Sequence, residues 1–365
     1  MTFDLAIVGG GPAGCSVAIM AARRGARVLL LERTRFPRHK VCGEFVSGES
    51  LGLLENLLGA GFQNLLFDAP RISDSRIFLD GSVLRAGVKP SAASIARFDL
   101  DFALWQTCLS SGVTARAQTG VRSVEGHGPF RIKTEDEVFT AAALINASGR
   151  WSSFTSPQVR SRNVKPTWIG IKAHFYEHNA ATSTDLYFFE GGYCGVQPVH
   201  PASNGPGMRI NACAMVRADL ANTLPEILGM HPDLSERSRM WEPAMEPVTT
   251  SPLVFHKPEP LQNAMLQVGD AAAFVDPFVG DGISLALRSG ALAAECLKPF
   301  FKRKCSLPEV ATAYSHAYQE RLGRVFKVSS MLRGWLRWPR AARKPMLSLI
   351  SSSPFISRQI VRLTR

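Results

Sequence analysis

The sequence lacks the features that would place it across a membrane or give it a covalent framework. Its 365 residues contain no run of about 18 uncharged apolar residues, which a helix needs to span a bilayer. The seven cysteines are odd in number, and no two of them stand in a CxxC spacing. We therefore expect neither a disulfide framework nor a metal site.

Acidic residues are nearly absent from the last part of the chain. From Lys298 to Arg365 the sequence has fifteen Lys or Arg but only Glu309 and Glu320, a balance of +13. Because the whole chain has a net charge of +12, the other residues together carry −1. The strong basicity is therefore confined to the tail, where it bears on binding partners and not on the fold.

We expect no cleavable leader ahead of the first motif. An apolar strand is expected over residues 3–8, and a glycine-rich motif follows it directly. A secretory signal would need a basic segment, an apolar stretch and a cleavage site before the folded domain. We expect a cytoplasmic protein, with peripheral attachment to the cytoplasmic membrane face as a further hypothesis.

What the chain does contain is a globular composition and, near its start, a βαβ unit. Apolar residues make up 45% and charged residues 20%, as in ordinary packed domains, and the length suits two of them. Residues 3–8 and 27–32 are apolar runs of the buried-strand type, and residues 16–25 have apolar positions at helical spacing. Strand, helix and strand in this order predict a parallel pair with a crossover helix.

The turn between the first strand and the helix has the spacing GxGxxG. Glycines at these places allow a tight turn, close approach of the backbone to a pyrophosphate, and close packing of the helix on the strand. The helix start adds free amides and a favourable dipole for the negative charge. The residues expected to hold a dinucleotide here are Gly9, Gly11, Pro12, Ala13 and Gly14.

Glu32 ends the second strand, where a carboxylate can accept hydrogen bonds from the 2′- and 3′-hydroxyls of a ribose. A phosphorylated ribose would be repelled there, so the pattern favours FAD or NAD over NADP. Arg33 follows directly. Stacking on the adenine and a solvated charge are equally good interpretations of this arginine.

A second motif lies between another expected strand, residues 261–269, and an expected helix, residues 282–301. A carboxylate at the strand end can bind a polyol such as ribitol, and amides at the helix start can face the pyrimidine end of a flavin and stabilise negative charge there. An enzyme that binds only NAD has no use for this motif, so the pair indicates FAD. The residues expected to bind it are Gly269, Asp270, Pro277, Gly280, Gly282 and Ile283.

This second motif resembles the GDAAxxxxPxxGxG segment of flavin monooxygenases related to p-hydroxybenzoate hydroxylase. It resembles still more the geranylgeranyl reductase group of that superfamily, and the likeness runs in order over roughly residues 1–300. Arg97, at the start of an expected helix, resembles a superfamily arginine that reaches the flavin nucleotide. The alternative from the residues alone is an ion pair with Asp99 or Asp101.

The resemblance implies FAD as cofactor, with NAD(P)H or another electron donor as reductant. Ser148 differs from the superfamily pattern. At this position flavin hydroxylases have the aspartate of an Asp-Gly pair, which is linked to the binding and use of FAD and NAD(P)H. The turn glycine, Gly149, is kept. The expectation for a pyridine nucleotide is weakened accordingly.

Two redox reactions compete for the flavin. The superfamily as a whole implies a monooxygenase that hydroxylates a hydrophobic small molecule. The Cys42-Gly43 pair resembles instead the geranylgeranyl reductases, whose cysteine lies near the isoalloxazine, and implies reduction of isoprenoid or other lipid double bonds. Cys42 is thus the candidate catalytic residue, although a buried cysteine is commonly an inert small hydrophobe. A non-catalytic, membrane-attached flavin-binding protein is the alternative of another class.

The substrate side carries weaker signals. Residues 192–198 lie where the reductases have a GYxWxFP strand, but Gly195 and Gln197 replace bulky aromatics. These replacements would change the substrate cavity, so the resemblance does not imply the same substrate as in the reductases. Flavin-dependent halogenases share the fold, but no WxWxIP element is present. Lys172 and His174 share one face of an expected strand. A hydrogen-bonded or solvated pair is the plainer interpretation, and a substrate-side proton donor is the other.

The predicted fold class is α/β, a Rossmann-type FAD-binding domain with an inserted antiparallel β-sheet substrate domain and a C-terminal helical segment. Strand-like stretches at 169–176, 185–189 and 208–216, with no helices between them, indicate the inserted sheet. A polar loop is expected over residues 33–50. The boundaries are 1–73, 94–162 and 260–300 for the FAD-binding domain, 74–93 and 163–259 for the substrate domain, and 301–365 for the basic helical segment.

In the tail, residues 321–338 combine basic positions with an apolar stripe at three- and four-residue steps, interrupted only by Ser329. With Trp335 and Trp338, this pattern suits an anionic membrane interface. The equal alternative is a helix packed on the body with its charges solvated. No nucleic-acid motif accompanies the charge. The expected partners are a hydrophobic small-molecule substrate and, through residues 321–365, an anionic membrane surface, with no nucleic acid.

Overall fold

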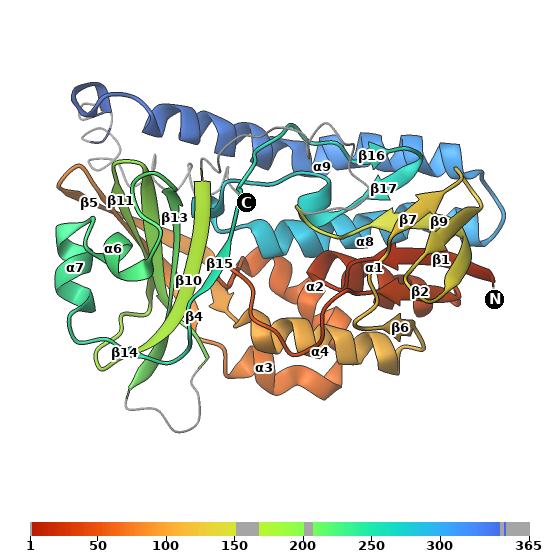
Figure 1. Cartoon of the computed structure of the whole chain (residues 1–365), viewed down its shortest axis with the longest axis horizontal. Coiled ribbons are helices and arrows are strands. Elements are labelled where there is room, and N and C mark those ends of the chain that lie inside the picture. Colours follow the sequence, from red (N-terminus) through yellow and green to blue (C-terminus); the bar gives the residue numbers. More distant parts are fainter. Residues whose placement is uncertain (1, 151–167, 201–206, 344–346, 348–365) are drawn as a thin grey trace.

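The computed structural model describes residues 2–150, 168–200, 207–343 and 347, which form two β-sheets at opposite ends of the molecule with a long helix running past both (Figure 1). The first sheet is built on the βαβ unit. Its central strand β1 (Thr2–Val8) pairs in parallel with β2 (Val28–Leu31) on one side and with β9 (Val138–Asn146) on the other. β6 (Thr114–Arg116) continues the sheet beyond β2, also in parallel.

Helices cover this sheet because its strands are apolar on both faces. All four residues of β2 are buried, as a strand of a parallel sheet requires. The covering helices are α1 (Pro12–Ala22), α4 (Arg97–Ser110) and α8 (Gly282–Phe301), the last with the predicted bounds. The first helix begins earlier than predicted because Pro12 occupies its first turn, where a missing amide hydrogen costs nothing.

The predicted strand over residues 261–269 is wrong in detail. The chain forms a short hairpin instead, with β16 (Leu261–Gln262) antiparallel to β17 (Met265–Gln267). Asn263 and Ala264 turn the chain with φ of 48° and 61°, a conformation that apolar patterning does not reveal. β17 then pairs in parallel with β9, while β7 (Ser123–Glu125) and β8 (Phe130–Lys133) form a second hairpin on β9.

The second sheet contains the predicted strands 169–176, 185–189 and 208–216, which are observed within longer elements. Its order is β14-β10-β13-β12-β11-β4-β5-β3, and β15 pairs with β10. Only the pairing of β4 with β11 is parallel among the strands of this sheet that the structure describes. The bounds are β3 Phe45–Val46, β4 Arg71–Leu79, β5 Ser82–Ser94, β10 Trp168–Glu177, β11 Ser183–Phe189, β12 Gly192–Pro198, β13 Met208–Arg217, β14 Glu242–Pro243 and β15 Val248–Thr250.

The loop predicted over residues 33–50 ends sooner than expected. β3 and the helix α2 (Gly48–Leu58) already begin within it, because buried Phe45 and Val46 pair with β5 as the edge strand of the second sheet. Two short helices cover the outer side of that sheet at the left of Figure 1, α6 (Leu224–Leu228) and α7 (Pro232–Ser238). Other short helices in the described residues are α3 (Gln63–Phe67) and the 3₁₀ turns Ala60–Phe62, Gly269–Ala271 and Pro277–Val279.

The described part of the tail contains one long helix, α9 (Leu307–Leu336), whose apolar stripe is packed on the body, while residues 344–346 and 348–365 of the predicted membrane-binding segment lie outside the described residues. Leu322, Val325 and Phe326 are buried in the main core, and Trp335 and Leu336 pack on the hairpin of β4 and β5. The sequence left open whether the stripe faces a membrane or the protein, and in the structure it packs on the protein. Among the described residues, no helix is long and apolar enough to cross a membrane.

Candidate cofactor site

The first glycine motif has two kinds of glycine. A Cβ at Gly9, where φ is +111°, would lie 2.2 Å from the carbonyl oxygen of Ala147, and one at Gly14 would lie 1.9 Å from that of Gly9. These two glycines are required by the packing of β1, α1 and β9. A Cβ at Gly11 would meet no atom within 4 Å. Gly11 therefore leaves open the space in which a pyrophosphate can approach the start of α1.

One cavity of about 870 Å³ joins the two motifs that the sequence places far apart. This volume lies in the range of small-molecule and cofactor sites. The predicted residues that line it are Gly11, Pro12, Ala13, Arg33, Cys42, Arg97, Gly269, Asp270, Pro277, Gly280, Gly282 and Ile283. Three others, Gly9, Gly14 and Glu32, do not line it and support the wall from behind.

Glu32 is buried and already has several hydrogen bonds. One oxygen accepts from the amide of Gly10 at 2.8 Å, and the other accepts from Thr34 and from Nη1 of Arg38 at 2.9 Å. Burial would raise the pKa of Glu32, but the charge of Arg38 and these hydrogen bonds lower it. Glu32 is thus an ionised carboxylate held on the nucleotide turn, and its contact with a ribose stays a prediction.

Arg97 makes the ion pair that the residues alone suggested, and its reach to the flavin nucleotide stays a prediction. Its guanidinium makes a bidentate pair with buried Asp101, at 2.6 and 2.8 Å, and it also lines the cavity. Burial alone would lower the pKa of Arg97, but Asp101 raises it. The arginine is therefore a fixed positive charge in the cavity wall.

At the second motif, Asp270 faces a residue that the sequence analysis missed. Nε of Arg150 lies 3.8 Å from a carboxylate oxygen of Asp270, whose side chain is 36% exposed. The guanidinium of Arg150 also stacks on Phe274, with its carbon 4.6 Å from the ring centre. Ser148 lines the cavity and donates to Oδ1 of Asn146 at 2.6 Å, so the serine closes the local turn.

A buried ion cluster holds the loop that carries Cys42, and its central residue was also missed. Glu44 binds Nζ of Lys172 and Nε2 of His174, the latter at 2.7 Å, and accepts the amide of Arg97 at 2.7 Å. The three side chains are at most 1% exposed. Lys172 and His174 are thus hydrogen-bonded, the plainer of the two interpretations. A signal was present, since Glu44 ends the Lys-Val-Cys-Gly-Glu run.

The electrostatics of this cluster favour an ionised carboxylate. Burial would raise the pKa of Glu44, but the charge of Lys172 and the hydrogen bond from His174 lower it to about 2. Burial lowers the pKa of His174, and Glu44 opposes this. Cys42 lies two residues away, where its sulfur is 3.4 Å from the amide of Glu44 and its carbonyl oxygen accepts from Asn211 at 3.0 Å.

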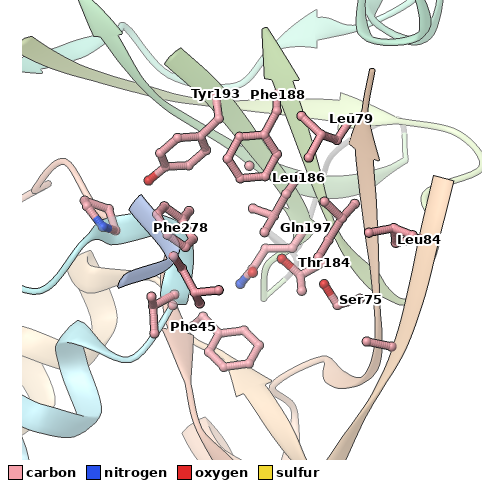
Figure 2. A pocket seen from close by; sticks show the side chains of 18 of the residues that line it. Phe45, Ser75, Leu79, Leu84, Thr184, Leu186, Phe188, Tyr193, Gln197 and Phe278 are labelled. Carbon is pink, nitrogen blue, oxygen red and sulfur yellow. The ribbon is translucent and has the colours of Figure 1, made fainter. Parts of the chain in front are cut away.

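A second, apolar chamber of about 210 Å³ adjoins the cofactor cavity (Figure 2). Leu79, Leu84, Leu186, Phe188 and Phe278 are among its walls, and Figure 2 shows few polar groups there, among them Ser75, Thr184, Gln197 and the hydroxyl of Tyr193. The two spaces share lining residues, namely Gly43, Phe45, Tyr193, Cys213, Pro277 and Gly280. They are therefore neighbouring parts of one site.

The shape of this chamber follows from the two departures noted in the sequence. A Cβ at Gly195 would lie only 3.3 Å from the side chain of Leu186, so a bulky aromatic there would occupy the chamber. Gln197 instead turns its amide to Ser94, at 2.6 Å from the hydroxyl oxygen. Small and polar residues at these positions leave the space open.

Known proteins resemble this chain along its whole length. A family model for FAD dependent oxidoreductases matches residues 4–37. Menaquinone reductase of Mycobacterium tuberculosis is 27% identical over 92% of this chain and 85% of its own. Digeranylgeranylglycerophospholipid reductase of Thermoplasma volcanium is 25% identical over 99% and 93%. The solved structure of the flavin-dependent brominase Bmp2 superposes with a TM-score of 0.80 at 18% identity, covering 100% of this chain and 93% of that one.

The chain is an FAD-dependent oxidoreductase, with the Rossmann-type fold of halogenases and geranylgeranyl reductase-like flavoproteins. The resemblance inferred from the two motifs is confirmed, and so is the predicted α/β fold class. The alternative of a non-catalytic flavin-binding protein is set aside, because the similar proteins are enzymes. The domain boundaries and the role of each site residue stay predictions.

Proposed function

We propose that this oxidoreductase reduces a double bond of a lipophilic, isoprenoid-like molecule. The observation that carries the proposal is the apolar chamber, which shares Gly43 and Tyr193 with the cofactor cavity. A ligand in the chamber would meet the flavin where the Cys42-Gly43 pair lies. Two of the similar proteins are named as reductases of a prenylated quinone and of a geranylgeranyl lipid, which agrees with an apolar substrate.

The residues of the larger cavity fit FAD. The open space at Gly11 and the start of α1 suit the pyrophosphate, and the carboxylate of Asp270 suits the ribitol. The amides at the start of α8, near Gly282, suit the pyrimidine end. Reduced FAD, when bound, supplies a hydride to one carbon of the double bond.

The other carbon needs a proton, and Tyr193 is placed to provide it. Its side chain lines both spaces, with its ring 6.1 Å from Phe278 and 5.5 Å from Phe188. Burial raises the pKa of Tyr193, which keeps the phenol neutral but makes it a weaker acid, so the proposed role rests on its position between the two spaces. The π bond of the substrate breaks and two C–H bonds form, one from the hydride of the flavin and one from the proton of the phenol. Solvent then returns a proton to the phenolate. The apolar walls keep other water away from the reacting atoms.

The test uses the purified holoprotein, reduced with dithionite without oxygen and mixed with a geranylgeranyl lipid or menaquinone. We expect the flavin to be reoxidised and the isoprenoid chain of the product to gain two hydrogens, located by fragment mass spectrometry after any quinol has been reoxidised to the quinone. Admitting oxygen, with and without halide, tests the other reactions. A product that gains an oxygen atom or a halogen, and no hydrogenated product, would replace the proposal with hydroxylation or halogenation.

Two variants separate the roles of the residues near the flavin. Tyr193→Phe keeps the ring and removes the proton, so we expect bound FAD to be unchanged and product formation to fall by about a hundredfold, the usual size of a general-acid contribution. Cys42→Ala tests the predicted catalytic cysteine in the same assay. NADH and NADPH, offered in place of dithionite, test the expected reductant.

A further inference from the structure

We infer that one face of α9 docks this enzyme on an anionic lipid bilayer. This outer face consists of Arg324, Lys327 and Met331, which recur at steps of three and four residues and therefore lie on one side of the helix, together with Trp338, two residues beyond the end of α9. All four are exposed, Met331 by 64% and Trp338 by 52%. The inference does not depend on which reaction the flavin carries out.

Burial of the apolar stripe decides how the helix can meet a membrane. Leu322, Val325 and Phe326 are turned into the protein core, so α9 cannot sink its apolar side into lipid as a free amphipathic helix does. What faces outward is positive charge with two large apolar side chains. Single exposed apolar residues are ordinary, but here they stand among cations and fit the boundary between lipid headgroups and acyl chains.

From Arg321 onward the charges of the sequence are of one sign, while exposed Glu320 lies one turn before Arg324 and Glu295 pairs with Arg321 at 3.7 Å. From Arg321 to Arg365 the sequence has eleven Lys or Arg and no Asp or Glu. Arg337 and Arg340, both exposed, stand on either side of Trp338. Clusters of four to eight basic residues next to a membrane bind anionic lipids, and this attraction is screened by salt.

The same helix also walls the apolar chamber. Leu332, Trp335 and Leu336 line the chamber. In the sequence, Leu332 directly follows Met331 of the outer face, and Leu336 lies two residues before Trp338. The end of the helix is fixed on the β4–β5 turn, because Arg340 and Arg343 donate to Asp80, each at 2.9 Å. A bilayer bound to the outer face would thus lie next to the wall of the space that accepts a lipophilic ligand.

The experiment is sedimentation of the holoprotein with vesicles of phosphatidylcholine, with or without phosphatidylglycerol. We expect binding only to the anionic vesicles, lost as salt is raised. The variant R324E/K327E should lower the bound fraction about tenfold while bound FAD is unchanged, since neither residue lines the cavity or the chamber. Trp338→Ala should weaken the binding that persists at intermediate salt.

The matched control is K302E/K304E, which makes the same change of charge on exposed residues of the turn between α8 and α9. If this control loses binding as much as R324E/K327E, net charge and not the outer face is responsible, and the inference fails. It also fails if wild-type protein ignores anionic vesicles at low salt. Binding of duplex DNA in place of vesicles, lowered by R324E/K327E, would assign the face to nucleic acid. No substrate is present, so none of these results depends on the proposed reaction.

Discussion

The cofactor cavity and the apolar chamber share six residues and yet are built in opposite ways. Much of the cavity is made by main-chain turns and charged residues close together in the sequence, such as those of residues 11–13 and 269–283. The chamber is made by single side chains of β3, β4, β5, β11, β12 and α9. A nucleotide site can therefore be carried by short motifs, whereas an apolar space exists only once distant elements have packed.

A buried ion cluster stands between these two regions. Glu44 belongs to the loop of the cofactor cavity, while Lys172 and His174 belong to β10 of the second sheet. We therefore expect a substitution in the cluster to lower both FAD binding and substrate binding. A substitution in a glycine turn should lower FAD binding, and one in the chamber wall should lower only the reaction with substrate.

The largest effect is expected for Lys172→Met, which leaves the carboxylate of Glu44 without its main counter-charge at a position with 0% exposure. Removing one partner of a buried ion pair costs about 3–5 kcal/mol. We expect the free energy of unfolding, measured in urea, to fall by that amount, with loss of both FAD and substrate binding. The double variant K172M/E44Q, which removes the charge pair, should recover part of the loss. A change below about 1 kcal/mol would show that the cluster does not join the regions.

The next effect is expected for Gly14→Ala, because the new Cβ would lie 1.9 Å from the carbonyl oxygen of Gly9. Overpacking of this kind costs about 3 kcal/mol. We expect lower stability of the apoprotein in urea and loss of bound FAD. Gly11→Ala is the matched control, since its Cβ meets nothing within 4 Å. It should bind FAD poorly but leave apoprotein stability unchanged, and a loss of stability there would contradict the assignment of Gly11 to the cofactor space.

The chamber is tested by Ala86→Phe, which places a ring in a space of about 210 Å³. We expect bound FAD to be unchanged and the rate at which menaquinone or a geranylgeranyl lipid reoxidises the reduced flavin to fall about a hundredfold, or roughly 2.7 kcal/mol. Ala313→Phe, on the exposed side of α9, is the matched control. If FAD binding falls together with the rate, the two spaces are not separable.

The same contrast explains what the sequence could predict. The cofactor motifs were readable because glycine at Gly9 and Gly14 is dictated by contacts within a few residues or with an adjacent strand. Arg150 and Glu44 were missed because their partners, Asp270 on one side and Lys172 and His174 on the other, lie more than 100 residues away in sequence. The hairpin at residues 261–267 was read as one strand, since its turn residues carry no glycine.

The chamber was not predictable in volume or in shape. Its walls come from elements whose apolar residues would look the same in an ordinary core, and only the small residues at Gly195 and neighbouring positions hinted at open space. Periodicity predicted the α9 stripe, with Leu322 and Val325 on one side, but not whether lipid or protein would cover it. That choice depends on the shape of the rest of the molecule.

The smallest effect concerns Asp276, which precedes Pro277 at the boundary of both spaces. Burial raises its pKa to about 7, although the charge of Arg333, 3.7 Å away, acts against this. The folded state then holds a proton that the unfolded state releases near pH 4, so the contribution of Asp276 to stability is present at low pH and is lost as pH rises towards 7.

Asp276→Asn removes this titration, so the variant should lose the decline in unfolding free energy that the wild type shows between pH 4 and pH 7. We expect the difference between the two proteins to change by about 1–2 kcal/mol across that window, because one pKa unit corresponds to roughly 1.4 kcal/mol and relaxation around the charge reduces the full shift. Urea unfolding at several pH values measures it. His174 changes stability in the opposite direction near pH 6.5, but it is common to both proteins and cancels in the difference. Arg333→Gln should extend the decline to higher pH, since it removes the charge that lowers the pKa of Asp276. Parallel curves for wild type and Asp276→Asn would mean that the carboxylate is solvated in the protein, and the boundary between the two spaces would then be wetter than the chamber beside it.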